Sequence, residues 1–246
     1  MKSSKSTSQN WIPTDKRFVV FLDILGFKDL VMRSTHEDIY KLLTGISEYR
    51  KIIDHMPESK KFPELFGNSG LYTVSFSDSI ILFSKDSTID SFKLITSSAG
   101  WLFAQTIKKT IPLKGAIAFG NISINKSNQI YFGQPIIDSY LLEEDLSYFG
   151  IVAHNSIDNY IKDNPDMGNI YDYYDVLTPF NKYGSIFHLN LDWFRYIDLE
   201  KNNIEKEYLL DKINSFKTMT SGNPRRYVDN TKKVIEAIYE KYNDVS

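Results

Sequence analysis

The sequence predicts an α+β fold in which a mixed sheet carries its helices on one face. Three observations predict this fold. A continuous apolar strand opens it, two shorter strand-like runs meet at a tight turn, and segments with helical spacing separate the strands. The resulting order is strand, helix, two strands, helix, strand, which is the βαββαβ order of the split βαβ or ferredoxin-like plan. We therefore expect a two-layer sandwich with a C-terminal helical extension.

The first half of the predicted sheet comes from residues 18–24 and 71–84. Residues 18–24 form an uninterrupted run of β-branched and aromatic residues, which is typical of a strand buried on both faces. Gly26 ends this run, and apolar residues at helical spacing continue to residue 53. Residues 71–84 are interpreted as two strands that turn near residues 77–79.

The second half of the predicted sheet follows a helix over residues 92–107, where apolar residues again recur at helical spacing. Residues 112–119 form the next strand, and residues 130–132 return as its partner. A helix over residues 133–144 and a short strand over residues 150–153 complete the order.

The C-terminal part of the chain has a different character. Residues 170–197 are aromatic-rich and irregular, with one strand expected over residues 185–190. Two helices close the chain. The last helix begins with Asn223 as its N-cap and Pro224 in its first turn, which is a favoured arrangement.

The composition indicates one globular domain. Of the 246 residues, 42% are hydrophobic and 24% are charged, which is enough for a real core. We expect a disordered tail over residues 1–15, a core over residues 16–160, and an extension over residues 161–246 packed on that core in the same domain. The start of the chain lacks an apolar signal segment, and no apolar stretch approaches the roughly 18 residues of a membrane span. A cytoplasmic protein without a membrane partner is expected.

Charge and cysteine content exclude several functions. The 29 basic and 31 acidic residues leave a net charge of −2, which is no electrostatic footprint for a nucleic acid polymer. A small phosphorylated substrate still fits, because a local site needs only a few donors and metal ions. The absence of cysteine excludes disulfides, thiolate catalysis and cysteine-based metal sites.

Two aspartates in apolar runs are the main candidates for chemistry. Asp23 stands near the end of the first strand and Asp78 at the turn of the following hairpin, and neither run contains a Lys or Arg. In a split βαβ sheet these positions meet at one edge. We predict that Asp23, Asp78 and the backbone carbonyl of Ile24 bind two divalent cations, Mn²⁺ or Mg²⁺, for phosphate chemistry. The alternative is that Asp23 caps a helix and Asp78 makes a turn, and the occurrence of both favours the metal site.

Gly26, Phe27 and Lys28 follow the first aspartate at the start of a predicted helix. Their backbone N–H groups are a candidate binding site for a triphosphate. Two roles are open for Phe27, which either stacks on the nucleobase or packs in the core.

Four segments resemble motifs of the class III adenylyl and guanylyl cyclases, in the same order. Residues 21–27 resemble the F-x-D-I-x-G-F element, and residues 77–83 resemble the second-metal hairpin G-D-x-x-L-A-x-F. Residues 114–120 resemble the strand R-x-G-I-x-x-G, and residues 131–143 resemble the helix G-x-x-V-N-x-A-x-R-L-E. The resemblance implies a cyclase that converts a nucleoside triphosphate to a 3′,5′-cyclic nucleotide and pyrophosphate by two-metal catalysis.

The departures from the family pattern concern residues other than the metal ligands. Ser77 replaces the glycine of the hairpin. The transition-state asparagine and arginine of the family correspond to Ile137 and Leu141, which cannot donate hydrogen bonds. The two positions that read adenine correspond to Val74 and Ile130. A purine substrate is therefore not expected.

One branch of the family shares such departures. Residues 113–117, 138–143 and 226–231 resemble the pyrimidine nucleotide cyclases of bacterial Pycsar anti-phage systems. This resemblance implies a homodimer that converts UTP or CTP to cyclic UMP or cyclic CMP during phage infection. It also implies a separate effector protein that senses the cyclic nucleotide.

With Leu141 in place of the family arginine, the phosphates need another cation. Arg225 and Arg226 are candidates, because they stand in the first turn of the last helix, where the helix dipole disfavours cations unless an anion compensates. A solvated or salt-bridged arginine pair is the alternative. Lys114 begins the matched strand and either faces the phosphates or is an exposed lysine at a strand end.

Two other functions are consistent with parts of the sequence. A diguanylate cyclase would carry a G-G-D/E-E-F turn, which residues 77–79 lack. The main alternative is a catalytically inactive, cyclase-like module that binds nucleotides and regulates. Ile137 and Leu141 favour this module, whereas the two metal-binding aspartates favour the enzyme.

Overall fold

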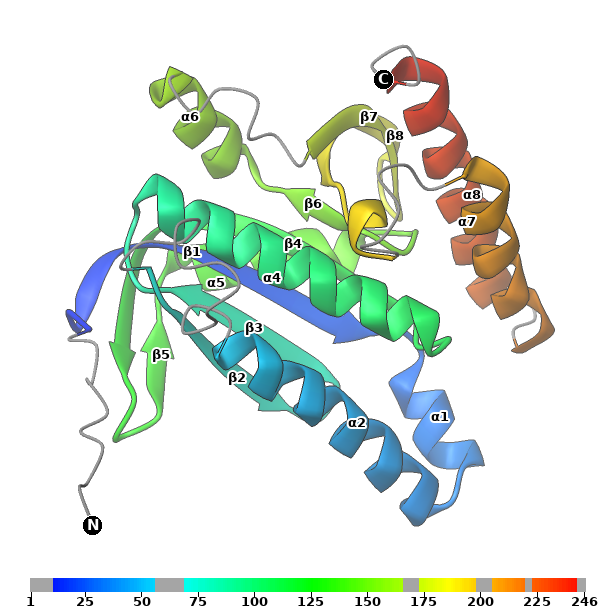
Figure 1. The fold of residues 1–246 in the computed structure, drawn as a ribbon, viewed down its shortest axis with the longest axis horizontal. Coiled ribbons are helices and arrows are strands. Elements are labelled where there is room, and N and C mark those ends of the chain that lie inside the picture. The colour runs from blue at the N-terminus through cyan, green and yellow to red at the C-terminus, as the bar shows by residue number, and fades with distance from the viewer. Residues whose placement is uncertain (1–10, 56–68, 166–172, 198–204, 220–222, 243–246) are drawn as a thin grey trace.

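A single sheet runs through the computed structural model, which describes residues 11–55, 69–165, 173–197, 205–219 and 223–242 (Figure 1). Its strands are β1 (Thr14–Ile24), β2 (Leu71–Phe76), β3 (Ser79–Ser84), β4 (Leu113–Asn125), β5 (Ile130–Phe132), β6 (Ile151–Ala153), β7 (Tyr173–Phe180) and β8 (Gly184–Leu191). Their order across the sheet is β2-β3-β1-β4-β6-β8-β7, and β5 pairs with β4 outside this path. The apolar strand β1 therefore lies inside the sheet, between β3 and β4.

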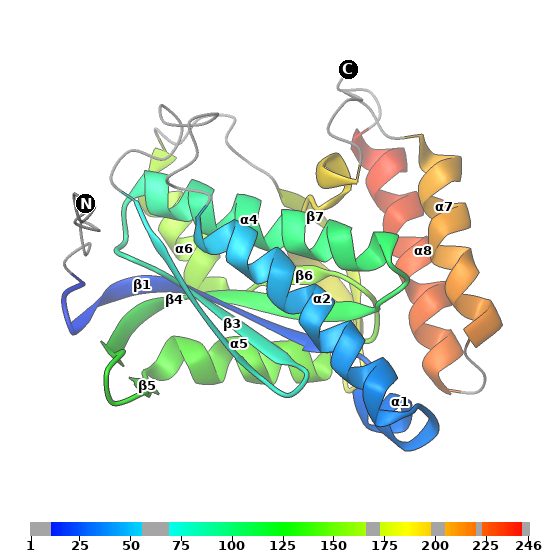
Figure 2. The ribbon, with the colours of Figure 1, turned by 60° about the horizontal axis from the view of Figure 1, so that its bottom comes forward.

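Seven α-helices and two short 3₁₀ helices flank the sheet in the described residues. The helices are α1 (Phe27–Arg33), α2 (His36–Asp54), α4 (Ile89–Lys108), α5 (Gln134–Asp145), α6 (Asn155–Asp163), η3 (Phe194–Tyr196), α7 (Lys206–Asn214), η4 (Ser215–Met219) and α8 (Asn223–Tyr242). Helices α7 and α8 pack side by side at one end of the sheet (Figures 1 and 2). No helix among the described residues is long and apolar enough to span a bilayer.

Helices cover both faces of the sheet, so the expectation of helices on one face is wrong. Phe18 of β1 packs on Phe92 of α4, with ring centroids 5.0 Å apart, whereas Phe21 packs on Tyr140 of α5 at 5.4 Å. Residues three apart on a strand point to opposite faces. Figure 2 shows α2 and α4 on one side of the sheet and α5 on the other. The cause lies in β1, because a strand that is apolar on both faces needs cover on both.

The start of α2 shows how local sequence sets an element boundary. The Thr35 side chain accepts a hydrogen bond from the backbone N–H of Asp38 at 3.2 Å, and the Asp38 carboxylate accepts one from the backbone N–H of Thr35 at 3.3 Å. This reciprocal capping box satisfies two N–H groups that a helix start leaves free. The helix therefore begins at His36, after a separate short α1.

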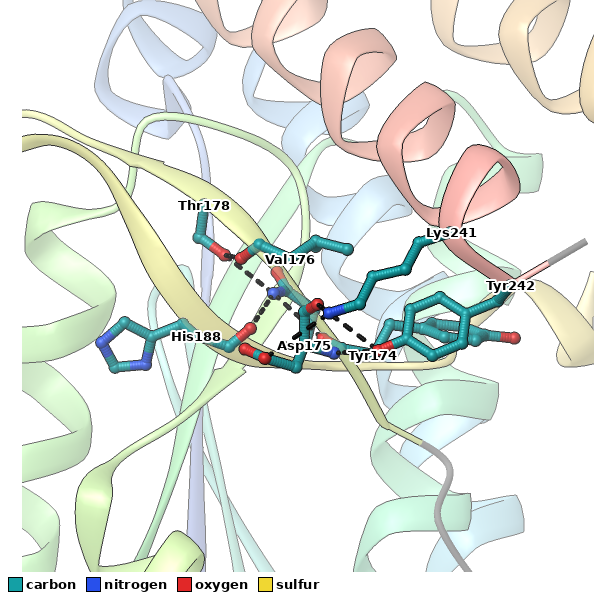
Figure 3. Close-up of polar contacts among 8 residues, drawn as sticks. Tyr174, Asp175, Val176, Thr178, His188, Lys241 and Tyr242 are labelled. Carbon is teal, nitrogen blue, oxygen red and sulfur yellow. Dashed lines mark hydrogen bonds and ion pairs between the residues drawn. The ribbon is translucent and has the colours of Figure 1, made fainter.

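The C-terminal part adds two strands to the sheet and fastens them to the last helix. Near the end of α8, Lys241 donates a hydrogen bond from Nζ to the backbone oxygen of Asp175 at 2.6 Å. The backbone N–H of Asp175 donates to the Tyr242 hydroxyl at 3.0 Å (Figure 3). The edge strand β7 is thus held by α8 on one side and by β8 on the other.

The βαββαβ order is confirmed, and the expected strand over residues 185–190 is found as β8. Strand β7 and helix α6 were not predicted. Pro179 argues against a strand in the sequence, but β7 is an edge strand, where proline is tolerated. Residues 1–10 of the expected tail lie outside the described residues, and β1 already begins at Thr14.

Candidate active site

The ends of β1 and of the β2–β3 hairpin meet, as the position of the two aspartates predicts. The backbone N–H of Ile24 donates a hydrogen bond to the backbone oxygen of Asp78 at 3.2 Å. Asp23 is paired across the sheet with Ser79 of β3 on one side and with Lys114 of β4 on the other. Asp23 and Asp78 therefore stand at the same edge, contributed by two elements 55 residues apart in the chain.

The Asp23 carboxylate is poorly compensated. Burial raises its pKa above the usual range, and the neighbouring Asp78 carboxylate raises it further. The opposing influences are a hydrogen bond from Ser79 Oγ at 3.0 Å and the more distant charge of Lys114. A partly buried carboxylate beside a second carboxylate is costly unless a cation joins them.

This pair of carboxylates fits a divalent cation that is completed by its ligand. No group of three or more His, Cys, Asp or Glu side chains suited to a metal ion occurs in the described residues. A Mg²⁺ or Mn²⁺ ion held by Asp23 and Asp78 would therefore take its other oxygens from water and phosphate. Mg²⁺ sites of this kind, with one or two carboxylates, are common where the substrate carries phosphates.

The turn that carries Asp78 shows why the cyclase hairpin motif has a glycine at the position of Ser77. Phe76 pairs with Ser79, so Ser77 and Asp78 are the two central residues of the turn. Ser77 has a φ of 57°, in the left-handed region that glycine adopts without strain. Serine therefore forms the same turn at a cost in backbone strain.

The segment after Asp23 begins a helix as predicted, and the structure decides between the two roles considered for Phe27. Gly26, with a φ of 75°, is the N-cap residue of α1 and has no side chain with which to cap the first N–H groups of the helix. Lys28 is exposed, whereas Phe27 is buried in the main hydrophobic core. Phe27 thus packs in the core instead of stacking on a base, because its ring lies on the covered side of α1. The triphosphate role of Gly26 and Lys28 stays a prediction.

The ammonium group of Lys114 is bound to groups within the protein. Its Nζ lies 3.1 Å from Glu143 Oε1, 3.0 Å from the backbone oxygen of Glu143 and 3.2 Å from that of Glu144. Both side chains of this ion pair are buried, at 9% and 4% exposure. The two backbone oxygens accept hydrogen bonds from the ammonium, and Glu143 Oε1 pairs with it as an opposite charge without a hydrogen bond of its own among the described residues. The expected contact of Lys114 with phosphates does not agree with this position.

Glu143 was not singled out from the sequence, yet it is the most perturbed carboxylate near the site. Burial raises the pKa of Glu143 to about 7, although Lys114 opposes the shift, and the nearby Asp23 adds to it. A Glu at the end of an amphipathic helix looks like an ordinary surface residue in the sequence. Only the packing of α5 onto β4 buries it.

Arg225 and Arg226 lie in the first turn of α8 and are exposed. Arg226 donates a hydrogen bond from Nη2 to Asn181 Oδ1 in the turn between β7 and β8. No ion pair of either arginine is found within the described part of the chain. Asn181 had no signal in the sequence, since it lies in the region without an interpretable motif.

The residues that replace the family transition-state pair point outward. Ile137 and Leu141 of α5 are 51% and 53% exposed, and Tyr140 between them is 44% exposed. Of the two positions that read adenine in the family, Ile130 is exposed, and Val74 packs against a small core with Val19 and Phe83. The surface of α5 is thus apolar where the family carries hydrogen-bond donors.

A pocket of about 190 Å³ lies between α2 and the hairpin that carries Asp78. Arg50 of α2 crosses its side and donates a hydrogen bond to Ser75 of β2. The pocket is lined by Ile24, Leu43, Ile46, Ser47, Arg50, Ser75, Ser77, Asp78 and Ile80. It borders the candidate metal site from the side of the helices α2 and α4.

Comparison with known proteins shows which solved structures have a similar fold. No family model and no curated protein matches the sequence. The monomeric guanylyl cyclase domain of the RhoGC fusion protein from the aquatic fungus Blastocladiella emersonii matches with a TM-score of 0.50 and 14% identity, over 72% of this chain and 100% of that chain. The chain has the fold of a class III cyclase catalytic domain.

Two further cyclase structures are similar at slightly lower scores. The guanylate cyclase domain of RhGC from Catenaria anguillulae, in complex with GTP, has a TM-score of 0.48 and 15% identity, over 72% of this chain and 96% of that chain. The catalytic core of a rhodopsin-guanylyl cyclase with converted specificity, in complex with ATPαS, has a TM-score of 0.49 and 15% identity, over 72% and 95%. At these identities the likeness concerns the fold.

Proposed function

We propose that the protein is a nucleotide cyclase that converts a nucleoside triphosphate to a 3′,5′-cyclic nucleotide and pyrophosphate. The observation that carries this proposal is the meeting of Asp23 and Asp78 at the end of β1, in a sheet with the cyclase fold. Among the described residues, Ser79 is the one hydrogen-bond partner of the Asp23 carboxylate, and this supports a role of the like-charged pair in cation binding.

The proposed reaction is an intramolecular displacement. The ribose 3′-hydroxyl releases its proton to solvent, and its oxygen forms a bond to the α-phosphorus. The bond from that phosphorus to the oxygen bridging to the β-phosphate breaks, and pyrophosphate leaves. Two bound divalent cations would supply charge stabilisation for the attacking and leaving oxygens. Asp23 and Asp78 would hold the cations, together with the backbone oxygen of Ile24, and the N–H groups after Gly26 would orient the phosphates.

We propose UTP or CTP as the substrate and cyclic UMP or cyclic CMP as the second messenger. The apolar side chains Val74 and Ile130 support this choice, because they offer no hydrogen bonds to a purine at the positions where the family reads adenine. By the resemblance to Pycsar cyclases, the enzyme acts in the bacterial cytoplasm in anti-phage defence, and a separate effector protein senses the product.

A homodimer is part of the proposal. Ile137, Tyr140 and Leu141 are exposed at helical spacing i, i+3 and i+4, so they share one face of α5. An apolar patch of this kind favours a partner surface. We expect Leu141→Glu to shift the protein towards monomer in sedimentation equilibrium, whereas Tyr208→Glu, at an equally exposed position on α7, leaves the oligomeric state unchanged. Equal behaviour of the two variants would contradict this face.

The second candidate function is a nucleotide-binding regulatory module without turnover. The observation that favours it is the apolar surface of α5, which lacks the donors that stabilise the transition state in the family. The poorly compensated carboxylates of Asp23 and Asp78 favour the enzyme over this module.

One assay separates the two functions. The purified protein is incubated with Mn²⁺ and each of ATP, GTP, CTP and UTP, and pyrophosphate and cyclic nucleotide are measured. We expect both products from UTP or CTP, and neither from the Asp78→Asn variant. Binding of a triphosphate without consumption would instead support the module.

A further inference from the structure

We propose that Asn181 is a positioning residue that holds Arg226 at the C-terminal end of α5, so that Arg226 contacts the phosphates of the nucleotide. The turn between β7 and β8, together with α8, thereby supplies the cation that α5 lacks at Leu141. This inference rests on the proposed function, and the ligand that it gives to Arg226 is the triphosphate of the substrate.

The Asn181 side chain is engaged at both ends. Its Oδ1 accepts the hydrogen bond from Arg226 Nη2, and its Nδ2 faces the backbone oxygens of Leu146 at 3.3 Å and Glu144 at 3.4 Å. Its own backbone N–H donates to the backbone oxygen of Asp145 at 2.7 Å. A side chain held this way offers its oxygen to Arg226 in one orientation.

The end of α5 connects this contact to the candidate metal site. The backbone oxygen of Glu144 accepts from Lys114 Nζ as well as from Asn181 Nδ2. Lys114 is the partner of Asp23 in the pairing of β4 with β1. Hydrogen bonds through the last turn of α5 therefore link Lys114 to Asn181 and Arg226, and strand pairing places Lys114 opposite Asp23.

Arg226 keeps most of its donors for a ligand. Its hydrogen bond to Asn181 uses one of the five guanidinium N–H groups, and the side chain is exposed in the described structure. The planar guanidinium matches the oxygens of a phosphate group in a two-point contact. Its place in the first turn of α8 is unfavourable for a cation by itself, and an anionic ligand would compensate.

The experiment compares Arg226→Ala, Asn181→Leu and the double variant, with Lys182→Ala and Lys233→Ala as controls. The controls remove exposed side chains from the same turn and from the same helix. Within the described residues, neither side chain forms a hydrogen bond or ion pair with Asn181 or Arg226. The quantities measured are kcat, KM for the triphosphate and the melting temperature, with the dissociation constant of the Mn²⁺–nucleotide complex from calorimetry.

We expect Arg226→Ala to raise KM and the dissociation constant by about 10- to 100-fold, the range for loss of a charged hydrogen bond. Asn181→Leu should raise both by about tenfold, and the double variant should be no weaker than Arg226→Ala. Asn181→Asp keeps an acceptor for Arg226 but loses the N–H donors to the backbone oxygens of Leu146 and Glu144. Its effect on KM and on the dissociation constant should therefore lie between those of the wild type and Asn181→Leu.

Two results would overturn the inference alone. One is a wild type that binds the triphosphate while Arg226→Ala binds it equally well. The other is an Asn181→Leu effect of the same size in the Arg226→Ala background, which would show that Asn181 acts on folding or on another group. A wild type that binds no triphosphate would overturn the proposed function and this inference together.

Discussion

Two pairs of charged residues lie next to each other at one end of the sheet, and they are built in opposite ways. Asp23 and Asp78 carry the same charge, and within the described part of the chain Asp23 is compensated by Ser79 and the more distant Lys114 alone. Lys114 and Glu143 carry opposite charges, are buried and have partners within the chain. The difference indicates that the first pair needs a partner from outside the protein, whereas the second pair serves the fold. Substitutions in the two pairs should therefore affect different measurements.

The largest expected effect is on activity and comes from the like-charged pair. Asp23→Asn or Asp78→Asn should lower cyclase activity by about 1000-fold or more, because several kcal/mol of charge stabilisation are lost and each 1.4 kcal/mol is tenfold in rate. The melting temperature should not fall, since the substitution removes repulsion between carboxylates. Pyrophosphate release and thermal unfolding measure the two quantities. A variant with normal turnover would show that Asp23 and Asp78 do not bind catalytic cations.

The opposite-charged pair should affect stability instead. Lys114→Met leaves Glu143 buried without its cation. At pH 8, above the raised pKa of Glu143, we expect the free energy of unfolding to fall by up to about 3–5 kcal/mol. The double variant Lys114→Met/Glu143→Leu removes both charges and should recover most of this loss. Urea unfolding measures the effect, with Lys233→Met as an exposed control. A single variant as stable as the wild type would show that the pair is not structural.

The pH dependence of stability gives a further test of the buried pair. Burial raises the pKa of Glu143 from 4.5 to about 7, so the folded state binds a proton that the unfolded state has released in this range. This contribution is fully present below pH 4.5 and is lost as the pH rises through 7. Relative to Glu143→Gln, the wild type should lose up to about 3 kcal/mol of unfolding free energy between these values.

Urea unfolding of both proteins at several pH values measures this difference, and the comparison of the two cancels the other titrating groups. If the unfolding free energy of the wild type, relative to that of Glu143→Gln, rises with pH, the attraction of Lys114 lowers the pKa of Glu143 more than burial raises it. Glu143 would then behave as an ordinary ion-paired carboxylate.

The smallest expected effect concerns the turn that holds Asp78. Ser77→Gly should raise the free energy of unfolding by about 0.5–1 kcal/mol, because the relief of left-handed strain exceeds the entropy that glycine adds to the unfolded chain. Ser34→Gly is a matched control, since Ser34 has a φ of −110° and should lose stability. Activity should change little, because the position of Asp78 is kept. Loss of stability in Ser77→Gly would show that the serine side chain contributes there.

Local signals in the sequence predicted the elements that carry the two aspartates. The apolar run that ends at Asp23, the turn at Asp78 and the alternation of strands and helices are patterns of a few adjacent residues, and the structure has all three. They also predicted that the two aspartates lie at one edge, because the βαββαβ order leaves few ways to arrange the strands. Their role as metal ligands stays a prediction.

The roles of Lys114, Glu143 and Phe27 were not readable in the same way. Each role depends on packing between elements far apart in the sequence. The contact between α5 and β4 buries Lys114 and Glu143, and Phe27 packs in the main hydrophobic core. Strand β7 was missed because residues 170–197 are aromatic-rich without a regular pattern, and its Pro179 is accommodated at the edge of the sheet, a position that the sequence does not reveal.

The sequence by itself determined the order of strands and helices and the chemistry available at the end of β1, because hydrophobic periodicity and turn residues act over short distances along the chain. Only the tertiary structure decided which charges are satisfied within the protein. That depends on burial and on partners far apart in sequence, such as Lys114 with Glu143 and Asn181 with Arg226.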